Sequence, residues 1–127
     1  MSTIFSKIIS GEIPAYKIYE DDYVVAILDL NPIQKGHTLV IPKQEVDQIF
    51  DLSEEMYDHM MRRVRYVAQV LKGKLDCNRV CIFVEGYGIP HVHVHLVPTN
   101  KPEEFDKALV YAATKDELEE VQKLLAH

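Results

Sequence analysis

The chain contains few cysteines, no long hydrophobic run and no excess of positive charge. Its two cysteines, Cys77 and Cys81, are too few for a disulfide framework, and their spacing fits neither a zinc knuckle nor a Cys-x-x-Cys redox motif. We therefore expect free thiols and a cytoplasmic protein. The apolar runs, such as residues 24–28, are too short to span a bilayer, and no secretory signal is visible. A membrane partner is not expected.

Length and charge narrow the class of protein further. The 127 residues suffice for one domain with its own core, and 47% of them are hydrophobic. The formal net charge of −6 lacks the basic footprint of a nucleic-acid binder, so no nucleic-acid partner is expected. Neither a GxGxxG nor a Walker loop occurs, which excludes those two devices for nucleotide binding.

Histidines are concentrated in one short segment. Residues 91–97 read His-Val-His-Val-His-Leu-Val, and prolines stand on both sides, at 90 and 98. Side chains alternate between the two faces of a β-strand, so a strand here puts His91, His93 and His95 on one face. The aliphatic residues between them would then form a buried face. The pattern predicts a row of imidazoles supported by the core.

The remaining elements follow from hydrophobic periodicity and from capping residues. Ser53 is a candidate N-cap for a long helix with a wide, Met-rich apolar stripe, and Thr114 with Glu117 forms a capping box for a last helix. A hairpin turn is expected at residues 21–22. Together, the signals predict short and long helices at 4–9, 54–73 and 115–125, and strands at 16–20, 23–29, 37–41, 79–84 and 91–97.

Short turns or one long helix join these strands, and no βαβ alternation is present. That organisation predicts an α+β domain, with a five-stranded antiparallel sheet that carries its helices on one face. The long helix and the short flanking helices would cover that face of the sheet.

Two chemistries suit a row of imidazoles. Two histidines of such a row can bind Zn²⁺ and leave a water site open, as in metal hydrolases. Alternatively, a neutral imidazole can attack phosphorus while its neighbour donates to the leaving group. Glu85 is the nearby acidic residue, and His37, beside Gly36 at a strand start, could join the pocket. His59 and His127 are expected on the solvated surface.

Four segments, in order, resemble the histidine triad (HIT) superfamily of nucleotide hydrolases and transferases. They are residues 4–14, the Leu28-Asp-Leu-Asn-Pro32 turn, residues 36–43, and the histidine run itself. The resemblance covers residues 1–100 of a single HIT-like domain, 1–127. Residues 101–127 would form a C-terminal extension with a helix.

The resemblance implies a homodimer, whose sheets join across a two-fold axis, and a pocket for a nucleotide substrate, with a purine base expected. His93 would be the nucleophile and form a nucleotidyl-histidine, with its Nδ1 bound to the His91 carbonyl. His95 would lie at the phosphate, and His37 would complete the pocket. Asp29 would bind the ribose. The residues implied to hold the base, which could also be simple core, are Ile4, Phe5, Ile8, Ile27 and Leu30.

The chain departs from the family pattern at three places. Many relatives carry structural zinc ligands where this chain has Thr3, Ser6 and Glu45, so no metal and no cofactor are expected. Many relatives carry Asn or Gln where this chain has Val84. The loop at 86–90 is short, without Ser or Thr before the triad. The phosphate thus loses polar contacts.

These features favour a hydrolase of substrates linked through a nucleoside 5′-monophosphate, either phosphoramidates or phosphoanhydrides. The alternative from another class is a catalytically weak, regulatory nucleotide-binding protein on the same fold. A metal hydrolase is the third reading.

Overall fold

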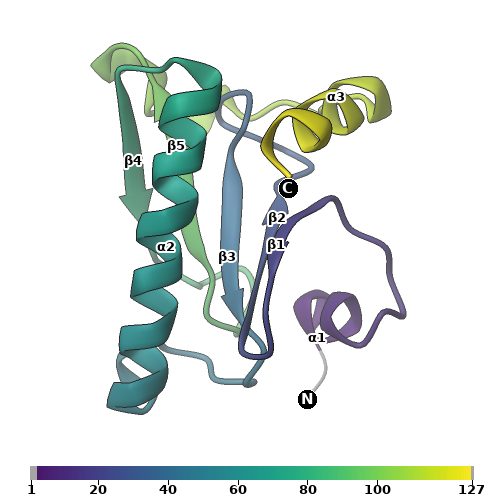
Figure 1. Ribbon diagram of the computed structural model, residues 1–127, viewed down its shortest axis with the longest axis vertical. Coiled ribbons are helices and arrows are strands. Elements are labelled where there is room, and N and C mark those ends of the chain that lie inside the picture. The colour runs from purple at the N-terminus through teal and green to yellow at the C-terminus, as the bar shows by residue number, and fades with distance from the viewer. Residues whose placement is uncertain (1–2, 127) are drawn as a thin grey trace.

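A five-stranded antiparallel sheet forms the centre of the computed structural model, which describes residues 3–126 (Figure 1). Its strand order is β1-β2-β3-β5-β4. The strands are β1 (Lys17–Glu20), β2 (Val24–Leu28), β3 (Thr38–Pro42), β4 (Arg79–Phe83) and β5 (Val94–Thr99). The α-helices are α1 (Ile4–Ile9), α2 (Glu54–Leu75) and α3 (Lys115–Leu125), and the 3₁₀ turns are η1 (Ile49–Asp51), η2 (Pro102–Glu104) and η3 (Lys107–Leu109). The α+β prediction is confirmed.

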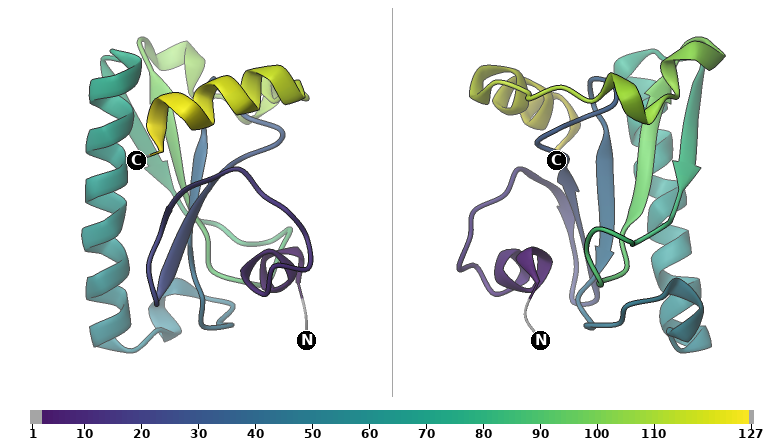
Figure 2. Two further views of the ribbon diagram at one scale, coloured as in Figure 1. Left: turned by 45° about the vertical axis from the view of Figure 1, so that its right-hand side comes forward. Right: turned by 180° about the vertical axis from the view of Figure 1, so that it is seen from behind.

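Both faces of the sheet are covered, which corrects the prediction of helices on one face only. Val24, Ala26 and Leu28 of β2 belong to a core that includes residues of α2 and α3. Val25 and Ile27 alternate with them and pack with α1 on the opposite face. Figure 2 shows α2 and α1 on opposite sides of the strands. The triad face is therefore the face that α1 partly covers.

The long helix α2 supplies the larger core. The Ser53 side chain accepts a hydrogen bond from the backbone N–H of Met56, as a Ser N-cap does. The helix continues through Gly73 and ends at Asp76, which adopts the left-handed conformation at φ 52°. Its buried residues are Met60, Val64, Val67 and Leu71. Within residues 3–126, no helix combines the length and apolar character that a membrane crossing requires.

The fifth strand begins later than its sequence pattern predicts. β5 starts at Val94, so His91 and His93 lie in the connection that leads into it. Pro98 lies inside the strand instead of ending it. Pairing between β5 and β3 stops at Leu96, and Pro98 faces only Val80 of β4. A residue without an N–H is tolerated there because the strand is paired on one side only.

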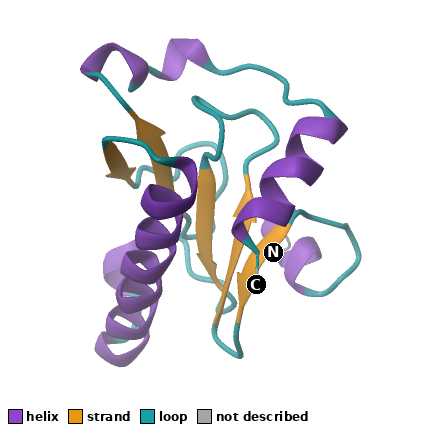
Figure 3. Cartoon of the chain, turned by 45° about the horizontal axis from the view of Figure 1, so that its top comes forward, coloured by secondary structure: helices purple, strands orange, loops and turns teal. Residues whose placement is uncertain are grey.

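The segment after β5 crosses one end of the sheet before it reaches α3 (Figure 3). Backbone N–H groups of Tyr111 and Ala113 donate to the carbonyls of Pro32 and Leu30. This contact ties the extension to the loop that precedes His37. The buried residues Leu118, Val121 and Leu125 of α3 then join the α2 core. Thr114 caps α3 by accepting from the Glu117 N–H, as predicted.

Candidate active site

Three histidine rings meet on the face of the sheet that α1 covers. His37 ends the loop before β3, His93 precedes β5, and His95 lies within β5 beside Leu39 of β3. The ring centroids of His93 and His95 are 4.8 Å apart, and those of His37 and His95 are 5.2 Å apart. His91 is 1% exposed and points elsewhere, toward Pro42 and Thr3. The triad is thus a cluster of His37, His93 and His95, with His91 behind it.

Gly36 lets the chain turn into His37. Its φ of 90° is in the left-handed region, and a Cβ there would overlap Leu75 Cδ1. The positive φ therefore favours glycine at the turn that leads into His37.

A backbone carbonyl fixes the tautomer of His93. Its Nδ1 lies 2.7 Å from the carbonyl oxygen of His91, and a carbonyl oxygen can only accept. Nδ1 therefore carries the hydrogen, and Nε2 keeps its lone pair. The Phe5 ring packs against the His93 ring at 4.9 Å between centroids. His93 is thereby prepared as a nucleophile or as a metal ligand.

The tautomers of His37 and His95 follow from a second chain of hydrogen bonds. The N–H of Ile33 donates to Nδ1 of His37 at 2.9 Å, so the hydrogen of neutral His37 is on Nε2. That Nε2–H donates to Nδ1 of His95 at 3.0 Å. Neutral His95 then carries its hydrogen on Nε2. Within residues 3–126, this buried atom has no hydrogen-bond partner. The cluster therefore presents one unused N–H donor.

Burial keeps this pair of imidazoles neutral. Burial, followed by the positive charges that His93, His37 and Lys107 can carry, lowers the pKa of His95 to about 3. Burial also lowers the pKa of His37, while the carboxylate of Asp29 acts in the opposite direction. Both rings are neutral hydrogen-bond donors near pH 7.

Asp29, His37 and His95 are close enough to suggest a metal site, since their ligand atoms lie within 4.8 Å of one another. The hydrogen-bond pattern argues against it. His37 Nδ1 already accepts from the Ile33 N–H, so a metal on Nε2 would require an imidazolate. The 3.0 Å contact between His37 and His95 instead needs a proton between the two nitrogens. Asp29 is the carboxylate beside the histidine cluster. Glu85, the acidic residue near the histidines in the sequence, lines a neighbouring cavity instead.

Asp29 lies at the edge of the histidine cluster. Its Oδ1 accepts from the Asn31 N–H at 2.9 Å, and its Oδ2 lies 3.6 Å from His37 Nε2. The second oxygen therefore remains available for a further donor, such as a hydroxyl.

The five residues implied to hold a base divide into two groups. Phe5, Ile8 and Ile27 are buried in the core between α1 and the sheet. Ile4 and Leu30 are 46% and 53% exposed. Of the five, Ile4 and Leu30 are therefore the residues with substantial surface to offer a ligand.

Two site residues, Phe83 and Lys107, have no distinctive signal in the sequence. The Phe83 ring stacks on the His95 ring at 4.0 Å with an interplanar angle of 6°. Lys107 Nζ lies over Phe83 at 5.1 Å from the ring centroid. Phe83 could have been suspected from its place at the end of β4, opposite His95. Lys107 comes from the C-terminal extension and brings a cation to the site.

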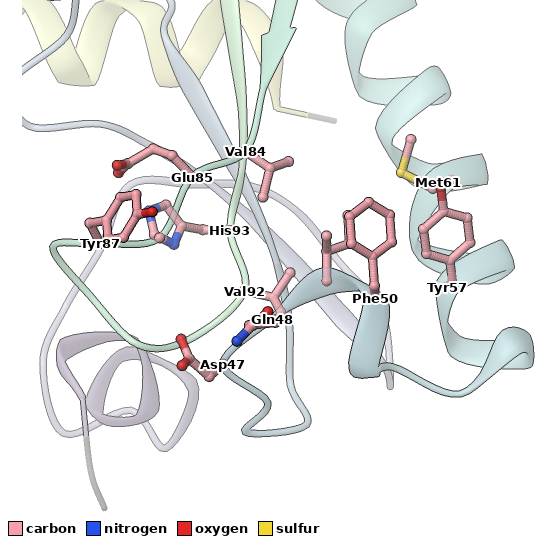
Figure 4. Close-up of a pocket in the computed structure, with 12 residues that line it drawn as sticks. Asp47, Gln48, Phe50, Tyr57, Met61, Val84, Glu85, Tyr87, Val92 and His93 are labelled. Atoms are coloured by element: carbon pink, nitrogen blue, oxygen red, sulfur yellow. The ribbon is translucent and has the colours of Figure 1, made fainter.

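A cavity of about 480 Å³ adjoins His93. Figure 4 shows Tyr57 and Met61 of α2 on one side of it and His93, Glu85 and Tyr87 on the other. Val84 also lines the cavity, without any group that donates a hydrogen bond. Gly86 and Tyr87 of the short 86–90 loop line the same cavity.

His59 is not the solvated surface residue that its sequence position predicts. It is half-buried, and its Nε2 lies 2.8 Å from the Asp21 carboxylate at the β1–β2 hairpin. It is remote from the triad. His127 lies outside the described residues.

The comparison with known protein families is decisive for the classification. The model of the HIT domain matches residues 10–102, which include all four site histidines. The chain belongs to the HIT family. An uncharacterized HIT-like protein of Methanocaldococcus jannaschii is 41% identical over 100 residues, which cover 75% of this chain and 77% of that protein.

Two further HIT proteins bear on function and on metal binding. An adenosine 5′-monophosphoramidase of Schizosaccharomyces pombe is 36% identical over 110 residues, covering 82% of this chain and 77% of the relative. A zinc-bound histidine triad protein of Mycobacterium smegmatis has a TM-score of 0.81 and 33% identity, with 98% and 91% of the two chains covered. This chain therefore shares the fold of a zinc-bound protein and the sequence pattern of a hydrolase.

Proposed function

We propose that this HIT protein hydrolyses substrates in which a leaving group is linked to a nucleoside 5′-monophosphate, through a nucleotidyl-histidine at His93. The observation that carries the proposal is the pairing of two ring nitrogens with complementary roles. His93 Nε2 has a free lone pair, and the neighbouring His95 Nε2–H has no partner within residues 3–126. The first suits attack on phosphorus, and the second suits a phosphoryl oxygen or a leaving atom.

The reaction has two balanced steps. First, the lone pair of His93 Nε2 forms a bond to phosphorus, and the bond from phosphorus to the leaving group breaks with its electron pair. A His95 that enters as imidazolium gives its Nε2 proton to the leaving atom and becomes neutral. Water then attacks phosphorus, the bond to His93 breaks, and His95 Nε2 takes the proton of the water. The products are the nucleoside monophosphate and the protonated leaving group.

Proton delivery is the difficult part of this scheme. An imidazolium at His95 carries a hydrogen on Nδ1, which faces the Nε2–H of His37 at 3.0 Å. His37 can switch tautomer only by losing the hydrogen bond from Ile33. A bound phosphate raises the pKa of His95 through its negative charge, but it must overcome this arrangement. The geometry therefore favours leaving groups that depart with little help from a proton, as in phosphoanhydrides.

The nucleotide and the leaving group have separate places in this proposal. Asp29 Oδ2 would accept from the ribose hydroxyls, and Ile4 and Leu30 would contact a purine base, while the buried Phe5 supports the His93 ring. Lys107 would add positive charge near the phosphate. The cavity lined by Glu85, Tyr87 and Val84 would receive the leaving group.

Turnover distinguishes this function from a regulatory nucleotide-binding role. Val84 and the short loop are the observations that favour the weaker activity. The test is a panel of adenosine 5′-phosphoramidates, dinucleoside polyphosphates and sugar nucleotides, with release of the monophosphate as the readout. Measurable binding of nucleotides without turnover of any member of the panel would leave the regulatory role as the better description.

We also propose a homodimer that forms at the free edge of β4. The opposite edge strand, β1, is covered by α3, where Gln122 Nε2 donates to the Lys17 carbonyl. On β4, Ile82 is 50% exposed, and Val84 beyond its end is 38% exposed. An apolar open edge is suited to pairing with a second copy about a two-fold axis. Light scattering at micromolar concentration should give the dimer mass, and Ile82→Lys should reduce it, whereas Leu124→Lys on exposed α3 should not.

The remaining predictions concern the domain organisation of the chain and its location in the cell. We still predict that residues 1–127 form one domain. We also still predict that the protein is cytoplasmic and has no nucleic-acid or membrane partner. The free thiols of Cys77 and Cys81 fit such a compartment.

A further inference from the structure

Residues from three separate segments meet behind the triad in a cluster that we call the polar tie: Thr3, Ser6, Glu45 and His91. Thr3 and Ser6 begin α1, Glu45 follows β3, and His91 precedes β5. Thr3 Oγ1 lies 3.3 Å from Ser6 Oγ and 3.5 Å from His91 Nδ1. Ser6 Oγ donates to Glu45 Oε1. The polar tie therefore joins the first helix to the catalytic segment.

Backbone partners and the Glu45 carboxylate fix the hydrogen positions of His91 and Ser6 in the polar tie. His91 Nε2 lies 2.8 Å from the Pro42 carbonyl and must carry the hydrogen, which leaves Nδ1 as an acceptor. The Glu45 carboxylate accepts, so the Ser6 hydroxyl uses its hydrogen there. Ser6 Oγ also accepts from the Thr3 N–H. The Thr3 hydroxyl hydrogen has two acceptors within reach, Ser6 Oγ at 3.3 Å and His91 Nδ1 at 3.5 Å, and among these four side chains it is the donor that His91 Nδ1 can use.

These positions do not fit the zinc site that the family resemblance implies. Cysteine thiolates and histidines are the ligands of structural zinc, whereas two of these groups are neutral hydroxyls. Both hydroxyls are already engaged in capping α1, since Thr3 and Ser6 form a reciprocal capping box. His91 Nδ1, the one good ligand, accepts from Thr3. The donor set is complete as a hydrogen-bond network and poor as a metal site.

We infer that the polar tie replaces a metal as the device that positions His93. It holds both ring nitrogens of His91 between Thr3 and Pro42, and the carbonyl of the same residue accepts from His93 Nδ1 at 2.7 Å. It also holds α1, whose Phe5 packs on the rings of His91 and His93. Thr3, Ser6 and Glu45 are positioning residues, and they act on the nucleophile through His91 and Phe5.

The first test measures His93 directly and needs no substrate. In ¹⁵N-histidine spectra, wild-type His93 should show the separated shifts of one fixed tautomer, with hydrogen on Nδ1. Thr3→Val and Ser6→Ala remove a hydroxyl with little change in volume, and they should move the two shifts toward each other. Thr3→Ser, which keeps the hydroxyl, should restore them. Glu55→Gln at the exposed start of α2 is the matched control. Unchanged His93 shifts in folded Thr3→Val would overturn the inference.

The second test uses catalysis and therefore rests on the proposed function. With an adenosine 5′-phosphoramidate, Thr3→Val and Ser6→Ala should lower kcat by about ten- to a hundredfold, because a small misplacement of the nucleophile is costly. KM should change less. Absence of wild-type turnover on every member of the substrate panel would contradict the proposed function while leaving the spectroscopic result intact. Equal kcat in wild type and in both variants would contradict the positioning role.

A designed metal site checks the geometry of the polar tie. The triple variant Thr3→Cys, Ser6→Cys, Glu45→His adds three zinc ligands around His91 Nδ1 and should bind one Zn²⁺. Zinc should then restore the fixed tautomer of His93, and the wild type should bind no stoichiometric zinc. Tight zinc binding by the wild type, or zinc in the triple variant with averaged His93 shifts, would overturn the inference.

Discussion

His93 Nδ1 lies 2.7 Å from the backbone carbonyl oxygen of His91. The two residues are neighbours on the same extended segment, so a single local contact sets which nitrogen of His93 is available. The same segment places His95 beside His93, with ring centroids 4.8 Å apart. The proposed nucleophile and its neighbouring N–H donor thus come from alternate positions of one chain segment, while their orientation depends on residues elsewhere.

Replacing His93 by Ala should abolish turnover and leave nucleotide binding largely intact, because the change removes only the group that forms the covalent bond. Rapid acid quench of the wild type should trap a nucleotidylated protein that His93→Ala does not form. His59→Ala, which removes a histidine remote from the triad, is the control. Wild-type rates in His93→Ala would rule out the mechanism.

Asp29→Asn should weaken the binding of ribonucleotides more than that of 2′-deoxyribonucleotides. A hydrogen bond to a charged acceptor is worth about 1.5–3 kcal/mol, and Asp29 Oδ2 has no backbone donor among residues 3–126. Titration calorimetry with the two sugars measures the difference, and the exposed Asp22→Asn is the control. Equal losses for both sugars would remove Asp29 from the ribose site.

Wild-type turnover should be slow on phosphoramidates with poor leaving groups and faster as the leaving group improves. Val84 adds no donor to the cavity beside His93, and loss of one transition-state donor typically costs about 2–4 kcal/mol. Val84→Asn should raise the rate on poor leaving groups, whereas Val84→Ala should not. A plot of log kcat against leaving-group pKa measures this. A fast rate without dependence on leaving-group pKa would show that backbone groups of the 86–90 loop compensate.

Activity should survive treatment with EDTA. A neutral His37 cannot take a metal on Nε2 while its Nδ1 accepts from Ile33, and Thr3, Ser6 and Glu45 stand where the family resemblance implies zinc ligands. The measurement is turnover before and after dialysis against chelator, with metal content by mass spectrometry. Loss of activity that Zn²⁺ restores would favour the metal hydrolase.

Asp21→Asn should destabilise the fold near neutral pH but not in strong acid. Burial acts to raise the pKa of Asp21, but hydrogen bonds from the Tyr23 and Val24 N–H groups, the Tyr19 hydroxyl and His59 lower it to about 2. A depressed carboxylate pKa stabilises the fold above the unfolded pKa of about 4, and that stability is lost as pH falls toward 2. Urea unfolding should show a deficit of about 2 kcal/mol at pH 7. A deficit of the same size at pH 2.5 would contradict the linkage.

Local patterns predicted most of the fold. The apolar spacing and the Ser53 cap gave α2, and the turn at residues 21–22 gave the β1–β2 hairpin, both of which the structure confirms. The sequence pattern did not predict that β5 begins at Val94 or that Pro98 lies inside it. The limits of β5 depend on which of its residues pair with β3, and the sequence alone does not show that. The cover that α1 gives to the second face was also missed. A six-residue helix has too short a pattern to show which face of a sheet it will meet.

What the sequence by itself determined is the set of groups: the alternating histidines, the aliphatic residues between them, and the HIT pattern that includes His37. A period of two residues fixes the face on which each side chain lies, whatever surrounds the strand. Only the tertiary structure decided how those groups are used. The bond from His37 to His95 spans 58 positions, and the contact from Thr3 to His91 spans 88. The proton of an imidazole goes to the nitrogen whose partner accepts it, and those partners come from loops and helix ends that only packing brings together.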